Sequence, residues 1–239
     1  MNASADHRLR TGAALGMAGL MLLAAAGCQD KSTAPSSAGA GAPSKAKVLS
    51  GTKLNSLLLP ASAMPKGFKL NADGVRNTGD SVASPSSSPV PRDKVCGMLV
   101  ETSWIRAAGI EGATFAQNDY GDPGQTSQVA QEIDTYHRDD AQKTMAALRK
   151  AFAGCTAFTE KTSGMTAKVK LVSSAVRGAG DEGIKAVVSS PIWEGGVTLA
   201  AVRVGNAVVT TLYSSTHRDK GAAAVKMAGE LAKKVQSAR

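Results

Sequence analysis

The triplet His-Arg-Asp occurs twice in this sequence, and its residue types could do chemistry. The copies are His137–Asp139 and His217–Asp219, 80 positions apart. The same triplet begins the catalytic loop of protein kinases, where an asparagine five residues after the aspartate holds magnesium. Here those positions are Thr144 and Ala224, and no glycine-rich nucleotide loop is present. The triplets therefore do not predict a kinase.

Both triplets instead lie where an expected strand ends and an expected helix begins. An aspartate at such a position can cap the helix, because its side chain accepts a hydrogen bond from a first-turn N–H group. Gln142, three residues after Asp139, adds a capping-box pattern, whereas Ala222 follows Asp219 at that spacing. We therefore expect Asp139 and Asp219 to begin the last two helices of the chain.

No other arrangement of residues predicts an enzyme. A serine hydrolase needs a Gly-x-Ser-x-Gly elbow, which does not occur. The acidic pairs Asp139–Asp140 and Asp181–Glu182 fall at expected turns or helix starts, where such residues are common. Neither His137 nor His217 lies at metal-ligand spacing from a cysteine. We expect no catalytic residues, no metal site and no cofactor.

The start of the chain has the pattern of an export signal. Arg8 and Arg10 precede an uncharged segment, 11–26, that is rich in Ala, Gly, Leu and Met. This segment is too short to span a bilayer and is typical of a signal peptide. It ends in "LLAAAGC", which resembles a bacterial lipobox, so we expect a signal peptide at 1–27 and a lipidated Cys28. The alternative is an ordinary secretory signal with an incidental cysteine.

The rest of the chain divides into a tether and one domain. Residues 28–50 are rich in Ser, Ala, Gly and Pro, which predicts a disordered tether spanning roughly 25 Å. Residues 51–239 are long enough for a single core. Within them, the Ser/Pro-rich segment 82–93 is expected to be an exposed loop.

The net charge of the chain bears on its partners. It is +9, and removal of the leader, with two arginines and one aspartate, leaves about +8. For an exported protein this charge favours an anionic lipid surface or wall polymer, and we expect no nucleic-acid partner. The basic residues are scattered along the chain, so plain solubility charge is the alternative.

The remaining cysteines predict one disulfide. If Cys28 is lipidated, Cys96 and Cys155 are left, and export places them in an oxidising environment. A bridge between them would close a loop of about 60 residues, which the chain-entropy model values at about 4 kcal/mol. Two buried free thiols are the alternative.

The hydrophobic periodicity predicts an α+β fold. We expect a single antiparallel sheet of about six strands with helices mainly on one face, because the strands follow one another through short links. An additional short strand is expected near 67–72. The helices are expected at 93–107, 139–154 and 219–236, and the six strands at 112–120, 126–136, 166–176, 183–190, 196–204 and 207–215.

The last two strands are apolar on both faces. With Gly205–Asn206 as a two-residue turn, Val202 lies opposite Val209 on one face, and Leu199 and Leu212 lie on the other. This pattern indicates interior strands that are covered on both sides. Helices can cover one side. The other would need the N-terminal segment, a partner subunit or a ligand, and packing of residues 53–72 is the ordinary outcome.

Three side chains are candidates for ligand binding. Trp193 and Tyr120 are large aromatic residues in an aromatic-poor chain, and Trp193 precedes a Gly-Gly turn that favours a surface position. Arg203 lies among apolar residues on one face of the last hairpin. Core packing is the alternative for the aromatic pair.

The order of several segments resembles a known family. These segments are "LLLPASAMPKGFKL", a helix bearing Cys96, "GATFAQNDY", "FAGCTAF", "GDEG", "VRVGNAVVTTL" and a C-terminal helix. Together they resemble the exported sensor-domain lipoproteins of actinobacteria, which are related to the extracellular domain of PknH-type receptor kinases. The resemblance covers roughly residues 51–236. It implies an antiparallel sheet with helices, stapled by disulfides, and a cleft proposed to bind an unidentified ligand.

Two functions follow as expectations. The first is a non-enzymatic ligand-binding or sensing module for a small-molecule or cell-wall ligand, held at the extracytoplasmic face of the cell membrane by lipid on Cys28. The second is an interaction or structural protein that docks on wall polymer or on a membrane protein. A lipid carrier is a weaker third candidate, since it needs a larger apolar cavity than this core can spare.

Overall fold

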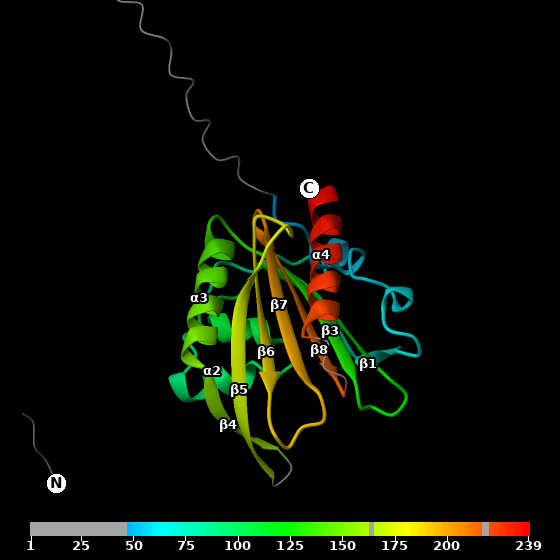
Figure 1. The fold of residues 1–239 in the computed structure, drawn as a ribbon. Coiled ribbons are helices and arrows are strands. Elements are labelled where there is room, and N and C mark those ends of the chain that lie inside the picture. Colours follow the sequence, from blue (N-terminus) through cyan, green and yellow to red (C-terminus); the bar gives the residue numbers. More distant parts are fainter. Residues whose placement is uncertain (1–46, 163–164, 217–219) are drawn as a thin grey trace, which may run out of the picture. The chain divides into compact units, whose positions relative to one another are not determined.

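The computed structural model describes residues 47–162, 165–216 and 220–239 (Figure 1). The predicted signal peptide, Cys28, nearly all of the predicted tether and the triplet at 217–219 lie outside the described residues. Within the described part of the chain, no helix is long and apolar enough to span a membrane.

Eight strands form one antiparallel sheet, where about six were predicted: β1 corresponds to the additional short strand expected near 67–72, and β4 was not predicted. The strands pair in the order β1-β2-β3-β8-β7-β6-β5-β4, so two meanders, β1–β3 and β4–β8, join where β3 pairs with β8. Their bounds are β1 Lys69–Asn77, β2 Thr114–Gly121, β3 Gln128–Thr135, β4 Ala157–Thr162, β5 Met165–Val176, β6 Glu182–Ser189, β7 Gly196–Val204 and β8 Ala207–Ser215.

Helices cover both faces of the sheet, which corrects the expectation that they lie mainly on one face (Figure 1). The C-terminal helix α4 packs on β7 and β8 from one side. Helix α3 and the short helix η2 pack on the opposite side. The bounds are α1 Gly51–Asn55, η1 Ala61–Ala63, α2 Arg92–Met98, η2 Trp104–Ala108, α3 Asp140–Gly154 and α4 Ala222–Ser237.

The two-sided hairpin explains this arrangement. Val202 pairs with Val209 and lies in the core under α4, whereas Leu199 pairs with Leu212 and lies in the core under α3. The predicted register is confirmed, and Gly205 supplies the left-handed conformation at the turn, with a φ of 59°. Because both faces are apolar, burial on one side alone would leave the other side exposed to water.

The N-terminal segment shares the α4 side of the sheet, as its expected packing requires. Leu54, Leu57 and Leu58 are buried in the same core as α4. The backbone of Leu59 is held from the sheet: its N–H donates to Gln131 Oε1 at 2.9 Å. Leu49, which the sequence places in the tether, is also buried there. The packed domain thus extends before residue 51.

Two element predictions needed correction. Strand β4 was missed because it is short and lies at the sheet edge, and among its residues 157–161 only Phe158 and Glu160 are partly buried. The helix expected at 93–107 is two pieces, α2 and η2. The break between them lets both Leu99 and Trp104 reach the same core, where the Trp104 ring stacks on Phe152 of α3 at a centroid distance of 5.7 Å.

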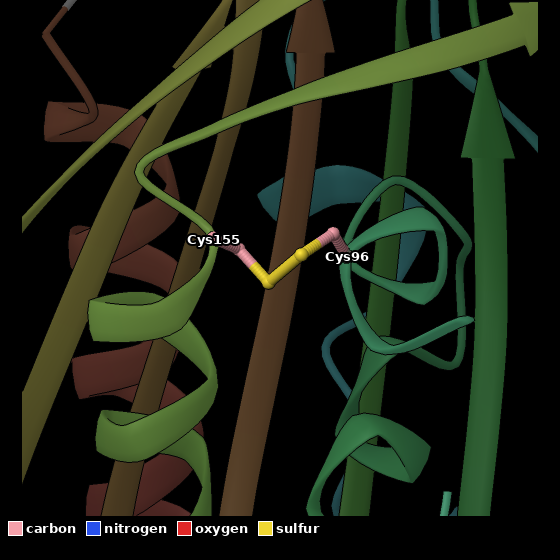
Figure 2. Close-up of a disulfide and its surroundings, with 2 residues drawn as sticks. All are labelled: Cys96 and Cys155. Carbon is pink, nitrogen blue, oxygen red and sulfur yellow. A yellow bond between two sulfur atoms is a disulfide. The ribbon is translucent and has the colours of Figure 1, made fainter. Parts of the chain in front are cut away.

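The predicted disulfide joins Cys96 of α2 to Cys155 at the end of α3 (Figure 2). The Cα atoms are 5.4 Å apart, and the bridge closes 59 positions of chain. The loop at 82–93 is exposed along nearly all of its length and is tied down by a bridge between Ser87 and Ile110.

The first His-Arg-Asp triplet does precede a helix. Asp139 occupies the position before α3, but its side chain makes no capping hydrogen bond. The carboxylate pairs instead with Lys143 at 3.0 Å. Helix α4 begins at Ala222, three residues later than predicted, and the expected cap at Asp219 lies outside the described residues.

Candidate functional site

Two carboxyl groups lie side by side inside the sheet. Glu132 and Asp134 alternate along β3 and therefore point to the same face. Their partners on the edge-side strand β2 are Gln117 and Phe115. The side chains of Glu132 and Asp134 are 5% and 4% exposed, although acidic residues are almost never fully buried unless paired. This burial makes the pair unusual among acidic side chains.

These carboxyl groups line a cavity of about 520 Å³, which we call the Glu132 cavity. It lies on the α3 side of the sheet, under η2 and the 82–93 loop. Its polar lining includes Arg76, Ser103, Arg106, Glu111, Glu132 and Asp134. Its apolar lining includes Pro89, Val90, Met98, Ile105, Ile110 and Phe115.

A hydrogen-bonded chain forms one wall of the cavity. Arg76 Nη2 donates to Gln117 Oε1 at 2.8 Å and to Ser103 Oγ at 3.1 Å. Ser103 Oγ donates to the same Gln117 oxygen at 2.6 Å, and Gln117 Nε2 donates to Asp119 Oδ1 at 2.9 Å. Strands β1 and β2 and the loop before η2 are thereby held together at the cavity.

Two glycines allow the backbone to approach the carboxyl groups. A Cβ atom on Gly112 would lie 2.7 Å from Asp134 Oδ1, and one on Gly74 would lie 2.6 Å from Asp119 Cβ. Such distances are too short for real contacts, so any other residue at these positions would displace the carboxylate. Gly74 lies in the irregular part of β1, between Asn71 and Arg76, where a bulge brings the strand close.

Burial is the main cause that raises the pKa of Glu132 from its ordinary 4.5 to about 7. A hydrogen bond to Ser103 lowers the pKa, as do the positive charges of Arg76 and Arg106, while the Asp119 carboxylate raises it. Loss of solvation outweighs the attraction of both arginines. Glu132 can therefore change its protonation state near neutral pH.

The neighbouring acids are shifted in the same direction. Burial, followed by the negative charge of Glu132, raises the pKa of Asp134 well above its usual value. Burial also raises the pKa of Asp119, although its hydrogen bond to Gln117 and the charge of Arg76 partly offset this. Asp134 therefore tends to hold a proton, and in that form it can donate as well as accept a hydrogen bond.

The geometry of the cavity can support the binding of a guest. Glu132 Oε2 and Asp134 Oδ2 are buried and have no hydrogen-bond partner in the described chain, so both stay unsatisfied unless a guest reaches them. Among the described residues, no group of three or more His, Cys, Asp or Glu side chains is placed to hold a metal ion. The cavity can accept a compact molecule with an apolar part and a polar end.

The residues predicted to bind a ligand are not brought together. Tyr120 lies on the opposite, α4 side of the sheet, where its hydroxyl donates to the Leu59 carbonyl at 2.9 Å. Arg203 donates to Glu182 Oε1 at 2.6 Å and to Asp181 Oδ2 at 2.9 Å. Glu182 also contacts Arg149 of α3. The bonds of Arg203 hold the end of the last hairpin. Tyr120 and Arg203 thus each have a structural role.

Trp193 is the predicted site residue that does reach a hollow. It lies before β7 and lines a separate cavity of about 440 Å³, together with Val100, Glu160 and Ile192. Part of the ring packs against the α3-side core. The lining also includes Glu194 and Ser214, and a binding role for Trp193 stays a prediction.

The sequence does contain a signal for the Glu132 cavity. The segment "AQEIDTY" places acidic residues at 132 and 134 on one face of a predicted strand. In the neighbouring strand β8, the partner of Asp134 is the buried Val208. Two acids at i and i+2 beside apolar strands predict buried carboxyl groups, but only once the pairing of β3 with β8 is known.

Comparison with known proteins supports the fold. No protein family model matches the chain, and no curated protein matches it. The crystal structure of the extracellular domain of PknH from Mycobacterium tuberculosis does match, with a TM-score of 0.59 and 17% sequence identity. The match covers 80% of this chain and 98% of that domain. The predicted PknH-like fold is therefore confirmed.

Because the raised pKa of Glu132 favours its protonated form in the folded chain, stability should depend on pH. The unfolded carboxyl ionises near 4.5 and the folded one near 7. The contribution of Glu132 to the free energy of unfolding is thus full below about pH 4.5 and is lost as the pH rises through 7. We expect this group to lower the free energy of unfolding by about 3 kcal/mol between those limits. Urea unfolding across this range measures it.

The change Glu132→Gln should remove this part of the pH dependence and make the domain more stable than the wild type at about pH 8. Glu111→Gln, which alters an exposed carboxyl group at the rim of the same cavity, serves as the matched control. Identical pH profiles for the wild type and Glu132→Gln would show that Glu132 is not the buried acid described here.

Proposed function

We propose that this chain is an extracytoplasmic lipoprotein, anchored through Cys28, whose domain binds a ligand in the Glu132 cavity and acts as a sensing module. The observation that carries the proposal is the cavity itself, with two unpartnered carboxyl oxygens at its floor. Such groups destabilise an empty domain. A guest that hydrogen-bonds to these oxygens would offset this cost, which packing alone does not.

The comparison supports an extracytoplasmic location. The PknH domain is extracellular, and the leader and the lipobox-like "LLAAAGC" of this chain predict export and lipidation. The Cys96–Cys155 disulfide supports the same location, because structural disulfides persist in oxidising compartments. A sensing role is carried over from the resemblance to the sensor-domain lipoproteins.

The cavity supports ligand binding by its size and its composition. Its volume of about 520 Å³ lies within the range of roughly 300–1,000 Å³ that small-molecule sites occupy. Apolar walls with a few convergent polar groups are also typical of such sites. The 82–93 loop supplies part of the wall, through Pro89 and Val90, so residues on an exposed segment have direct access to the guest.

Protein purified from its native organism should carry a small molecule that blocking the cavity removes. Ala83 lines the cavity, and Ala83→Trp would fill it with a large side chain. Native mass spectrometry should show a bound mass in the wild type and its loss in the variant. Ala157→Trp, on an exposed strand position outside the cavity, should retain the mass.

Circular dichroism would confirm that both tryptophan variants are folded. An empty wild-type protein would count against ligand binding as the function. A mass retained by Ala83→Trp would place the ligand elsewhere, with the Trp193 cavity as the next candidate.

Replacement of the predicted lipidated cysteine should release the protein from membranes. Cys28→Ala removes the thiol that would carry the lipid, so the chain loses the proposed anchor. Fractionation of cells should move the protein from the membrane pellet to the soluble or secreted fraction. Ser32→Ala, four residues later in the tether, is the control and should remain in the pellet. Retention of Cys28→Ala in the membrane pellet after a high-salt wash, which screens contacts between lysines and lipid headgroups, would contradict the lipid anchor.

A second candidate function is supported by a lysine-bearing face of the sheet. Four lysines lie on the α4 side of β4–β6: Lys161, Lys168, Lys170 and Lys185. The residues that alternate with them in β5, Val169 and Leu171, are buried in the core on the α3 side, so the lysines face the other side. Among the described residues of these three strands, no acidic side chain shares this face. The exposed Val172 lies among the lysines. Such a surface suits docking on anionic lipid headgroups.

Vesicle sedimentation tests this docking. The full chain with Cys28→Ala should bind vesicles that contain phosphatidylglycerol more tightly than vesicles of phosphatidylcholine alone. Lys168→Glu with Lys170→Glu should abolish the difference, since each basic residue near such a surface contributes about 1 kcal/mol. The control pair Lys66→Glu and Lys69→Glu makes the same change in charge near β1, at the opposite sheet edge. An equal loss of vesicle binding in the two double variants would show that the binding depends on net charge alone.

A further inference from the structure

The floor of the Glu132 cavity presents two acceptor atoms without partners. Glu132 Oε2 and Asp134 Oδ2 are fully enclosed, and the described chain offers neither of them a hydrogen bond. An unpaired buried polar atom costs about 1–3 kcal/mol, and most such atoms in proteins are paired. A guest that brings hydrogen-bond donors to this floor would remove the cost at both atoms.

The charge at the floor selects a donor and rejects an anion. An anionic group here would meet the carboxyl groups of Glu132 and Asp134, with Asp119 close enough to act on Glu132. The two arginines of the lining, Arg76 and Arg106, have exposed side chains. Arg76 is already bonded to Gln117 and Ser103. A cationic donor would gain attraction to Glu132 once that carboxyl group ionises, and a hydrogen bond to the carboxyl group of Asp134, in a poorly solvated site.

The walls select an organic cation over a metal ion. Met98, Ile105, Ile110 and Phe115 present apolar surface to the cavity, which would bury an alkyl or ring portion of a guest. No set of three or more metal-ligating side chains is formed among the described residues. The cavity therefore combines an apolar wall with a floor that can receive a single cationic head.

We propose that the Glu132 cavity binds an organic ammonium ion with a compact apolar body, whose ammonium group donates hydrogen bonds to Glu132 Oε2 and Asp134 Oδ2. This inference rests on the proposed function and names the ligand class of the same cavity. The ammonium group has three donors, enough to satisfy both acceptors and one further oxygen.

Binding should release a proton and strengthen as the pH rises. The pKa of Glu132 is about 7 in the empty cavity, and an ammonium ion favours the ionised carboxylate, so the carboxyl proton passes to solvent. A primary amine stays protonated to about pH 10. The fraction of the protein with an ionised Glu132, and with it the affinity for the amine, should increase about ten-fold between pH 6 and pH 8. The charged groups that face Glu132 are Arg76 on β1, Asp119 on β2, Asp134 on β3 and Arg106 on η2.

Titration calorimetry of the full chain tests the proposal with three probes that share a six-carbon chain and differ in the polar head group. Hexan-1-amine should bind with a Kd of about 1 mM or tighter at pH 8. Hexan-1-ol, which brings one neutral donor, should bind at least ten-fold more weakly, and hexanoate should not bind. Repeating the titration in two buffers with different ionisation enthalpies should reveal proton release on binding.

Matched variants locate the site. Glu132→Gln should fold, since it removes a buried acid, and should weaken hexan-1-amine binding and abolish its pH dependence. Asp134→Asn should weaken binding without abolishing that dependence. Glu160→Gln is the control, because Glu160 is a partly buried carboxylate in the separate Trp193 cavity. It should leave binding unchanged.

The outcomes distinguish this inference from the proposed function. Tighter binding of hexanoate or hexan-1-ol would overturn the ammonium assignment but leave a ligand-binding cavity in place. Loss of amine binding in Glu160→Gln with retention in Glu132→Gln would overturn the location. No binding of any probe would overturn the inference, and if native protein also proved empty, the proposed function would fail with it.

Discussion

The central strands of this sheet are apolar on both faces, and the rest of the structure depends on covering both. Val202 and Val209 are buried under α4, while Leu199 and Leu212 are buried under α3. Leu54, Leu57 and Leu58 of the N-terminal segment complete the layer on the α4 side. The Cys96–Cys155 disulfide holds α2 against the end of α3 in the layer on the α3 side. Together the two layers contribute hydrophobic burial that a single layer of helices could not supply.

The Glu132 cavity lies where the layer on the α3 side of the sheet changes from a long helix to a short helix and a loop. Over β7 and β8, helix α3 packs closely, whereas over β2 and β3 the roof is η2 and the 82–93 loop. Loop and short helix leave space that close-packed helices would fill. The lysine face lies on the opposite side of the sheet. A domain docked through those lysines would therefore keep the cavity clear of the surface that it binds.

Much of the fold could be predicted from local pattern. The β7–β8 register followed from Gly205–Asn206 and the alternation of valines, and the single disulfide followed from the cysteine count. Strand β4 could not be predicted, because an edge strand buries few side chains and leaves a weak periodicity. The candidate site was missed for a related reason: Glu132 and Asp134 look like ordinary polar strand positions until their neighbours are known.

The sequence by itself determined the strand and helix periods, the two-sided burial of the last hairpin and the pair of cysteines available for a bridge, because these depend on the spacing of residues near one another in the chain. Tertiary structure alone decided which helix covers which face, the separation of Tyr120, Arg203 and Trp193, and the burial of two carboxyl groups beside a cavity. Those properties depend on contacts between segments far apart in the chain, and hydrophobic periodicity carries no information about them.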